Sequence, residues 1–238
     1  MKNKRILRIV LRNFRDIFKL WSNLRKMMKN TDFDRFDKWR HIQKYLRKIH
    51  GNAGVRLNIH YANHRPTGEG NIIYANHQSL YDPIALIVNS AVPLSAVCKI
   101  ELKDKIIVKD IIEATDSNYI DRNSLKQSLR TFNDIADKVS KGYNFVIFPE
   151  GTRSKNGNTM GEFHAAAFKC AIKSKATIHP VVLVDMYKAL DANTKGEVET
   201  HLYYLAPIKY EEYQGMKSTE ISELVKSRIQ EILNIHSK

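Results

Sequence analysis

Between Ile72 and Pro83 the sequence reads IIYANHQSLYDP, a strand-loop-helix pattern that sets the fold class of the chain. The residues from Ile72 to Ala75 form a short apolar run, which indicates a buried strand. Polar residues follow directly, and Pro83 is typical of the first turn of a helix. A strand that leads through a polar loop into a helix predicts an α/β fold with chemically active side chains at the rim of its sheet.

His77 and Asp82 in this loop form a candidate acid–base pair. A neutral histidine can take a proton from an attacking hydroxyl, and a carboxylate on its other ring nitrogen fixes the tautomer and stabilises the imidazolium. Two structural roles compete with this interpretation. Asp82 can cap a helix whose first residue is Pro83, or Ser79 and Asp82 can form a capping box. The sequence alone leaves these alternatives open.

The rest of the chain alternates between predicted strands and helices. Ser124 and Gln127 suit a capping box for a helix that runs to about Ser140, and Gly142 is expected to stop it. Predicted strands cover residues 55–61, 72–75, 94–98, 145–148, 178–184 and 198–205, and predicted helices cover 83–88, 102–112, 124–140, 164–173 and 221–235. This order predicts a mixed sheet flanked by helices.

Two further polar clusters contain arginine. The first, FPEGTRS at residues 148–154, follows a predicted strand, and Pro149 and Gly151 suit the second and fourth positions of a tight turn. A turn needs no arginine, however, and the planar fork of Arg153 suits a phosphate group, which Gly151 lets the backbone approach. The second cluster, YIDR at residues 119–122, places Arg122 just before a capped helix, where a solvated surface arginine is the simple alternative.

The first 50 residues hold most of the excess charge of the chain. They carry 16 Lys or Arg against 4 Asp, within a formal net charge of +14. A second predicted helix begins after Thr31, whose side chain can cap it, and ends at Gly51. The first predicted helix has an apolar stripe at steps of three and four residues, formed by Ile6, Val10, Phe14, Ile17, Trp21, Leu24 and Met28.

Two basic amphipathic helices with Trp and Phe on their apolar sides are what an in-plane membrane anchor needs. A helical hairpin docked on the core or on a second subunit is the alternative. We expect residues 1–50 to form a two-helix membrane-anchoring segment and residues 51–238 to form a catalytic domain.

Several functional classes lack support in the sequence. Cys98 and Cys170 belong to no C-x-x-C motif, and His60 and His64 flank a strand end, so neither a disulfide framework nor a metal site is expected. No G-x-S-x-G elbow or P-loop motif is present. The longest charge-free run, residues 83–98, is 16 residues long, too short to span a membrane, and we expect no signal peptide.

The three polar clusters together resemble those of the glycerolipid acyltransferase family, in particular bacterial 1-acyl-sn-glycerol-3-phosphate acyltransferases, over residues 72–184. NHQSLYD resembles the family's Asn-His-x-x-x-x-Asp block, which implies that His77 is a general base oriented by Asp82. Residues 118–122 resemble its Phe-Ile-Asp-Arg block, and FPEGTRS resembles its Glu-Gly-Thr-Arg block. The resemblance implies that the acceptor, centred on its phosphate, is bound by Lys99, Arg122, Glu150, Gly151, Thr152 and Arg153.

One position departs from the family pattern. Asp116 stands where the second block usually begins with glycine, so the path of this loop and the placement of Arg122 depend on how Asp116 folds. Residues 178–184, with Pro180, resemble the family's fourth block, a hydrophobic strand.

The resemblance implies transfer of a fatty acyl group from acyl-ACP or acyl-CoA to the sn-2 hydroxyl of 1-acylglycerol 3-phosphate, giving phosphatidic acid for phospholipid biosynthesis, with no cofactor. The expected partners are the lysophospholipid acceptor, the thioester donor and an anionic membrane surface on the cytoplasmic face, to which the protein attaches as a monotopic or peripheral protein. Residues 51–238 carry 23 basic and 21 acidic side chains, so no nucleic-acid partner is expected. The alternatives are another acceptor, such as glycerol 3-phosphate or a lyso-aminolipid, or a non-catalytic basic protein that binds membranes or nucleic acid.

Overall fold

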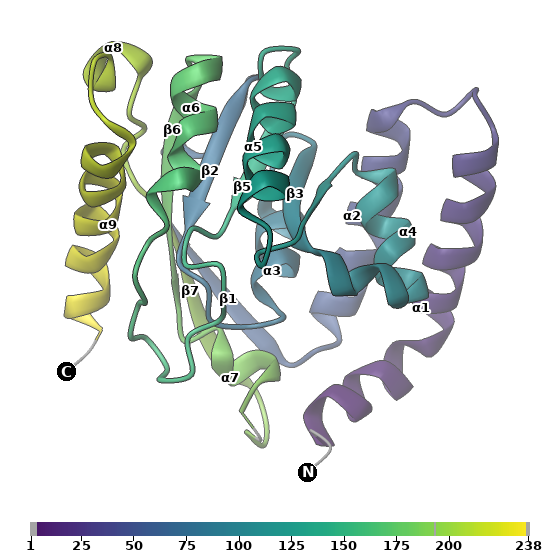
Figure 1. Ribbon diagram of the computed structural model, residues 1–238. Helices are drawn as coiled ribbons and strands as arrows, with labels where there is room; N and C mark the ends of the chain where they lie inside the picture. Colours follow the sequence, from purple (N-terminus) through teal and green to yellow (C-terminus); the bar gives the residue numbers. More distant parts are fainter. Residues whose placement is uncertain (1–3, 193, 237–238) are drawn as a thin grey trace.

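A computed structural model describes residues 4–192 and 194–236. Within these residues the strands form a seven-stranded sheet in the order β1-β7-β6-β2-β5-β3-β4 (Figure 1). The strands are β1 (Val55–His60), β2 (Asn71–Ala75), β3 (Leu94–Lys99), β4 (Asn118–Ile120), β5 (Asn144–Ile147), β6 (Thr177–Val184) and β7 (Val198–Tyr204).

The direction of the strands decides where their ends lie. β6, β2, β5, β3 and β4 run parallel to one another, so their carboxyl ends meet at one edge of the sheet. β7 pairs antiparallel with β6 and parallel with β1, which makes the sheet mixed, as the sequence predicted. Polar loops that leave the carboxyl ends of parallel strands commonly form the binding crevice of α/β folds.

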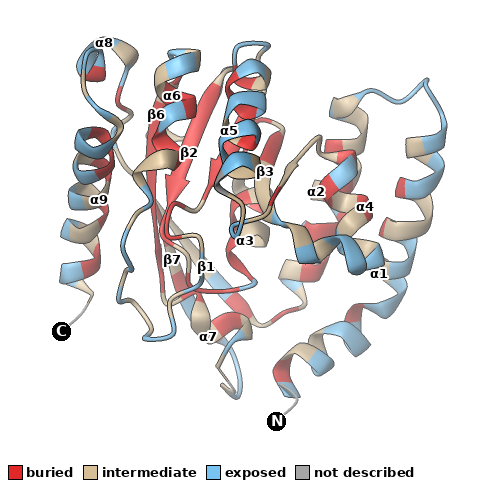
Figure 2. Ribbon diagram, viewed as in Figure 1, coloured by how far each residue is buried: buried red, intermediate tan, exposed pale blue. Residues whose placement is uncertain are grey.

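Both faces of the sheet are covered by helices because the central strands are apolar on both sides. Ile72 and Tyr74 of β2 belong to one core, and Ile73 and Ala75 belong to the other. The first core includes α5 (Leu125–Val139), α6 (Lys169–Ser174) and α9 (Ser218–Ile235), and the second includes α2 (Arg35–Gly51), α3 (Asp82–Asn89) and α7 (Tyr187–Leu190). Figure 2 shows the buried strands between these layers.

The N-terminal helices pack on the rest of the fold. Leu20 and Leu24 of α1 (Lys4–Lys29) lie in a core cluster with Ile42 of α2 and Ala114 of α4 (Ile106–Ala114). Trp21 Nε1 also donates to the Asp110 carboxylate of α4 at 2.7 Å. The division of the chain at residue 50 stays a prediction, since the two sides of that boundary share a core.

Two details of the N-terminal prediction are wrong. The side chain of Asp34, three residues beyond Thr31, caps α2 in a complete capping box with Asp37. The predicted apolar stripe of α1 is divided: Leu24 is buried, whereas Phe14 is 57% exposed. When a helix has apolar residues on more than one face, the periodicity of its sequence does not indicate which face packs against the rest of the protein.

Elsewhere the elements match the prediction apart from short or irregular ones. The predicted helix at residues 102–112 is split into the 3-10 helix η2 (Ile100–Asp104) and α4, and the one at 164–173 into η3 (Ala165–Phe168) and α6. Only half of the predicted capping box forms, because Ser124 accepts from the Gln127 amide while the Gln127 side chain binds Asp121 and Tyr119. β4, α7, α8 (Tyr210–Tyr213) and the 3-10 helix η1 (Ala62–His64) were not predicted. None of the described helices is long and apolar enough to span a membrane.

The side chain of Arg5 joins α1 to two loops of the catalytic region. It is 4% exposed. Its guanidinium donates to the carbonyl oxygens of Ala53 and Gly54 before β1, of Ala189 in α7, and of Thr194 and Gly196 before β7. The shortest of these contacts is 2.7 Å, to Ala189. A buried guanidinium is tolerated only when its donors are satisfied, and here backbone carbonyls satisfy them.

We predict that Arg5→Ala lowers the free energy of unfolding by about 3 kcal/mol, because it removes a charged donor from several buried carbonyls at once. Arg8→Ala on the same helix, where Arg8 is exposed, is the matched control and is expected to change it by less than about 0.5 kcal/mol. Urea denaturation of both variants measures the difference. Equal stabilities of the two variants would show that the Arg5 contacts contribute nothing.

Candidate active site

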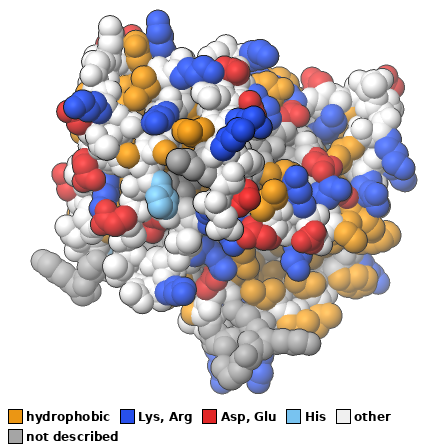
Figure 3. Space-filling view, viewed as in Figure 1, with side chains coloured by type: hydrophobic (Ala, Val, Ile, Leu, Met, Phe, Trp, Pro, Cys, Tyr) orange, Lys and Arg blue, Asp and Glu red, His pale blue; other side chains and the backbone are white. Residues whose placement is uncertain are grey.

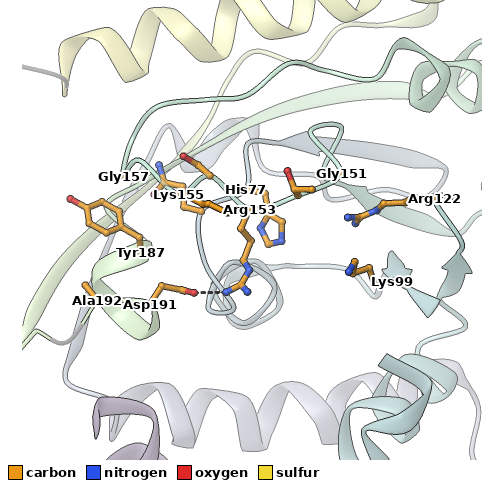
Figure 4. A pocket seen from close by; sticks show the side chains of 13 residues that line it. His77, Lys99, Arg122, Gly151, Arg153, Lys155, Gly157, Tyr187, Asp191 and Ala192 are labelled. Atoms are coloured by element: carbon orange, nitrogen blue, oxygen red, sulfur yellow. Dashed lines mark hydrogen bonds and ion pairs between the residues drawn. The ribbon is translucent and has the colours of Figure 1, made fainter. Parts of the chain in front are cut away.

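Loops from five strands surround a cavity of about 520 Å³ at the carboxyl edge of the parallel strands (Figure 4). The loop after β2 contributes His77 and Gln78, and the region after β6 contributes Tyr187, Asp191 and Ala192. The remaining lining residues come from β3, β4 and β5 and the loops that follow them, namely Lys99, Arg122, Gly151, Thr152, Arg153, Ser154, Lys155 and Gly157. The structure therefore brings six of the eight predicted site residues to one cavity, while Asp82 and Glu150 lie behind its wall.

His77 and Asp82 are in direct contact. His77 Nδ1 lies 2.7 Å from Asp82 Oδ2, and the Asp82 side chain is fully buried. The imidazole stacks on the ring of Phe148 with centroids 4.2 Å apart. With its Nδ1 proton donated to a carboxylate, the ring carries its lone pair on Nε2, which has no partner among the described residues. This nitrogen is able to accept a proton from a molecule in the cavity.

The competing structural role of Asp82 turns out to be compatible with this contact. Asp82 Oδ2 also accepts from the backbone amides of Gln78 at 2.6 Å and Ser79 at 2.9 Å. The bond from Ser79 is one half of the predicted capping box; in the other half the Ser79 hydroxyl accepts from Tyr81 instead. The other predicted role is wrong in detail: α3 begins at Asp82 with Tyr81 as its N-cap, so Asp82 is not the capping residue and Pro83 is the second residue of the helix. The same carboxylate thus folds the loop and orients the imidazole.

Glu150 supports the backbone of His77 and does not line the cavity. Its side chain is 5% exposed, and Oε1 accepts from the His77 amide while Oε2 accepts from the Gly161 amide, both at 2.7 Å. Burial raises the pKa of this carboxyl group, and the two amide donors oppose the rise. Ser154 N donates to the His77 carbonyl at 2.7 Å, so residues after β5 hold both backbone polar groups of His77.

The turn expected at Gly151 forms, and the same residue also lines the cavity. Gly151 N donates to the Phe148 carbonyl at 3.0 Å, which closes the turn. Gly151 has φ +67°, and a Cβ there would meet His164 Cδ2 at 3.2 Å. Glycine is required at this position both by its backbone conformation and by the space available.

Asp116 explains why the neighbouring loop tolerates the departure from glycine. It follows α4 with φ +52°, the left-handed conformation that glycine adopts readily and aspartate adopts more easily than most residues. Its carbonyl accepts from Lys138 Nζ at 2.6 Å. The loop therefore continues into β4 and brings Arg122 to the cavity. Desolvation lowers the pKa of the Arg122 guanidinium and the Glu101 carboxylate raises it, but an arginine stays charged.

The cationic side chains lie on two sides of His77 (Figure 4). Lys99 and Arg122 are on one side, and Lys99 Nζ lies 3.2 Å from Glu101. Arg153 is on the other side and its Nη1 contacts the Asp191 carboxylate. Such an arrangement can hold an anionic group next to the imidazole. Among the described residues, no group of His, Cys, Asp and Glu side chains is arranged to hold a metal ion.

Sequence reasoning missed the lining residues that belong to no motif. Lys155 and Gly157 follow the third polar cluster, and Tyr187, Asp191 and Ala192 follow the strand β6. The position after a buried parallel strand was the available signal for the second group, but α7 was not predicted and so did not direct attention there.

Comparisons with known proteins point to one family. A protein-family model described as "Acyltransferase" matches residues 56–184. The chain is 32% identical over 129 residues to a probable 1-acyl-sn-glycerol-3-phosphate acyltransferase of Mycoplasma genitalium. The matched region covers 52% of this chain and 47% of that protein. It is 26% identical over 174 residues to the 1-acyl-sn-glycerol-3-phosphate acyltransferase of Borreliella burgdorferi, covering 71% and 69% of the two chains. The chain spans about half the length of the Mycoplasma relatives that it matches.

A similar fold is found in a solved structure. The crystal structure of the 1-acyl-sn-glycerophosphate acyltransferase from Thermotoga maritima has a TM-score of 0.77 to this chain, and the match covers 98% of both chains at 17% identity. This likeness concerns the fold, and it extends over the N-terminal helices as well as the sheet.

We predict that Glu150→Gln disturbs the His77 backbone, because the Gln side chain offers one acceptor oxygen where the carboxylate offers two. One of the two buried amides then faces an NH₂ group, at a cost of about 1–3 kcal/mol. The amide that loses its acceptor, at His77 or Gly161, is expected to exchange its hydrogen faster than in the unchanged protein. Unaltered exchange at both amides would contradict the assigned support role.

The raised pKa of Glu150 adds a pH dependence. The folded protein holds the Glu150 proton more tightly than the unfolded chain does, so the contribution of Glu150 to stability is complete below pH 4.5 and is lost as the pH rises through the folded pKa. The stability of the unchanged protein relative to Glu150→Gln should therefore fall from acidic to neutral pH.

Proposed function

The chain belongs to the acyltransferase family, and on this premise we propose that it transfers a fatty acyl group from an acyl thioester to the sn-2 hydroxyl of 1-acylglycerol 3-phosphate. The product is phosphatidic acid, and the thioester is carried by acyl carrier protein or coenzyme A. The observation that carries the proposal is the His77–Asp82 pair at the wall of a cavity with cationic side chains on both sides. The acceptor has a hydroxyl, which the His77–Asp82 pair can deprotonate, and a phosphate, which the cationic side chains can bind.

His77 acts as the general base. Nε2 takes the proton of the acceptor hydroxyl as its oxygen bonds to the thioester carbonyl carbon, and Asp82 stabilises the imidazolium that results. The tetrahedral intermediate then collapses, the carbon–sulfur bond breaks, and the proton passes from His77 to the leaving thiolate. Both substrates are bound together, so the protein contributes no nucleophilic side chain.

The cationic residues bind the acceptor phosphate and thereby fix the direction of attack. Arg122 and Arg153 offer planar guanidinium forks that suit phosphate oxygens, and Lys99 adds a point charge. Gly151 and Thr152 let the backbone come close to the substrate at the same wall. Glu150 acts indirectly, through the backbone of His77.

The carbonyl oxygen of the tetrahedral intermediate needs hydrogen-bond donors already in place. The amide of Gly151 is engaged in the turn. The amides of Thr152 and Arg153, for which the described residues offer no acceptor, are the donors that we assign to this role.

We predict that His77→Ala lowers the rate of acyl transfer by roughly 10²–10⁴-fold, since that is the usual cost of losing a general base. The protein should remain folded, because the His77 side chain is not part of the core clusters. The assay is product formation from lysophosphatidate with acyl-CoA and acyl-ACP, with circular dichroism as a check of folding. Near-normal turnover by the folded variant would exclude His77 as the base.

The acceptor resides in a lipid bilayer, so we also propose that α1 attaches the protein peripherally to the cytoplasmic face of an anionic membrane. Five apolar side chains of α1 are exposed, namely Leu7, Val10, Leu11, Phe14 and Phe18. Figure 3 shows hydrophobic side chains with basic ones among them over this helix, at the right of the view. Burial of the apolar side chains in lipid and attraction of the basic ones to anionic headgroups act together.

We predict that Leu11→Glu combined with Phe18→Glu releases the protein from vesicles of anionic lipid and lowers activity on bilayer substrate. Deletion of α1 is a poorer test, because it also removes Leu20 and Leu24 from the core. The matched control is Ile235→Glu in α9, where Ile235 is 68% exposed compared with 63% for Leu11. Sedimentation with vesicles measures binding, and equal binding by the double variant and the control would exclude α1 as the attachment surface.

A further inference from the structure

We propose that Asp191 is a positioning residue that orients Arg153 for the acceptor phosphate and ties it to the loop of the candidate base. This inference rests on the function proposed above. No motif contains Asp191, which follows α7 and lines the cavity.

The two oxygens of the Asp191 carboxylate have different partners. Oδ1 contacts Arg153 Nη1. Oδ2 accepts from the Ser79 hydroxyl at 2.5 Å and from the Leu80 amide at 3.1 Å. One carboxylate therefore bridges two loops that leave the carboxyl ends of different strands, β2 and β5.

The segment that Asp191 holds is the one that also holds the His77 imidazole. Asp82 accepts from the Ser79 amide, while Asp191 accepts from the Ser79 hydroxyl. Ser79 is fully buried between these two carboxylates. The loop of the base is thus fixed from the inside by Asp82 and from the cavity side by Asp191.

Asp191 itself is held in place. Its amide donates to the Tyr187 carbonyl at 2.9 Å, which closes the end of α7. The buried Arg5 donates to the carbonyls of Ala189 and Thr194 on either side of Asp191. A carboxylate on an anchored backbone can order a flexible partner, whereas a carboxylate on a mobile loop would only follow it.

The charges that line the cavity indicate that Asp191 does more than hold the two loops together. The lining residues include four cations, Lys99, Arg122, Arg153 and Lys155, and the carboxylate of Asp191. A carboxylate close to a site for a phosphate weakens phosphate binding unless it offers a compensating gain. The gain here is the ordering of Arg153, whose side chain is 39% exposed and would otherwise lose its conformational freedom at the moment of binding. The donors of Arg153 other than Nη1 remain for the phosphate.

The two links can be broken separately. Asp191→Asn keeps an oxygen for Ser79 and Leu80 but turns an NH₂ group toward Arg153, and Ser79→Ala removes the hydroxyl link while leaving the ion pair. We expect Asp191→Asn to raise the acceptor KM by about 3- to 10-fold with kcat and the thioester KM nearly unchanged. Ser79→Ala is expected to lower kcat more than it changes the acceptor KM.

A double-mutant cycle tests whether Asp191 acts through Arg153. In an Arg153→Ala background, Asp191→Asn should no longer raise the acceptor KM and can lower it by removing a repelling charge, whereas a purely structural effect would raise the acceptor KM in both backgrounds. The control Asp137→Asn, which breaks an ion pair with Lys173 between α5 and α6, should alter neither KM. An unchanged acceptor KM in Asp191→Asn, or an equal rise with and without Arg153, would overturn the proposal.

A binding measurement separates this outcome from failure of the proposed function. If the unchanged protein transfers no acyl group to lysophosphatidate, the proposed function fails, and calorimetric titration with glycerol 3-phosphate still tests Asp191. The Kd should rise by about 3- to 10-fold in Asp191→Asn. An unchanged Kd would overturn the positioning role by itself.

Discussion

The contact between a fully buried carboxylate, Asp82, and the imidazole of His77 is the interaction on which the rest of the site depends. An ionised carboxylate removed from water is costly unless several donors surround it. Here the backbone amides of Gln78 and Ser79 and the Nδ1 proton of His77 all converge on one oxygen. The loop must wrap around Asp82 to supply these donors, and the wrapped loop leaves Nε2 of the imidazole facing the cavity.

The same principle operates at two neighbouring carboxylates. Glu150, buried beside the loop that carries His77, accepts from the amides of His77 and Gly161. Asp191 accepts from Ser79 and Leu80 and pairs with Arg153. Three acidic side chains, Asp82 at the start of α3, Glu150 after β5 and Asp191 after α7, therefore hold one short segment. The segment is buried at Gln78 and Ser79, and charge-assisted hydrogen bonds to these carboxylates satisfy its polar groups and set its geometry.

The helices of the N-terminal region belong to this framework. α1 shares a core with α2, α3 and α4, and its Arg5 binds the carbonyls around the Asp191 loop. The outer face of the same helix exposes apolar side chains such as Leu11 and Phe18. If that face rests on a membrane as proposed, the surface that holds the lipid and the wall of the cavity are connected through α1.

The sequence by itself determined the order of most strands and helices and the mixed α/β class, and it indicated the His77–Asp82 pair and the Gly151 turn, because these depend on local periodicity and on motifs within a few residues. The tertiary structure alone decided three things. It determined which face of α1 packs, since several faces are apolar. It placed Glu150 behind the cavity wall and not on it, since the amides that it binds belong to distant segments. It also brought Asp191 to Arg153 and Ser79, 38 and 112 residues away along the chain. Contacts between the ends of different parallel strands leave no periodic signal in the sequence, because the order of strands in the sheet is not their order in the chain.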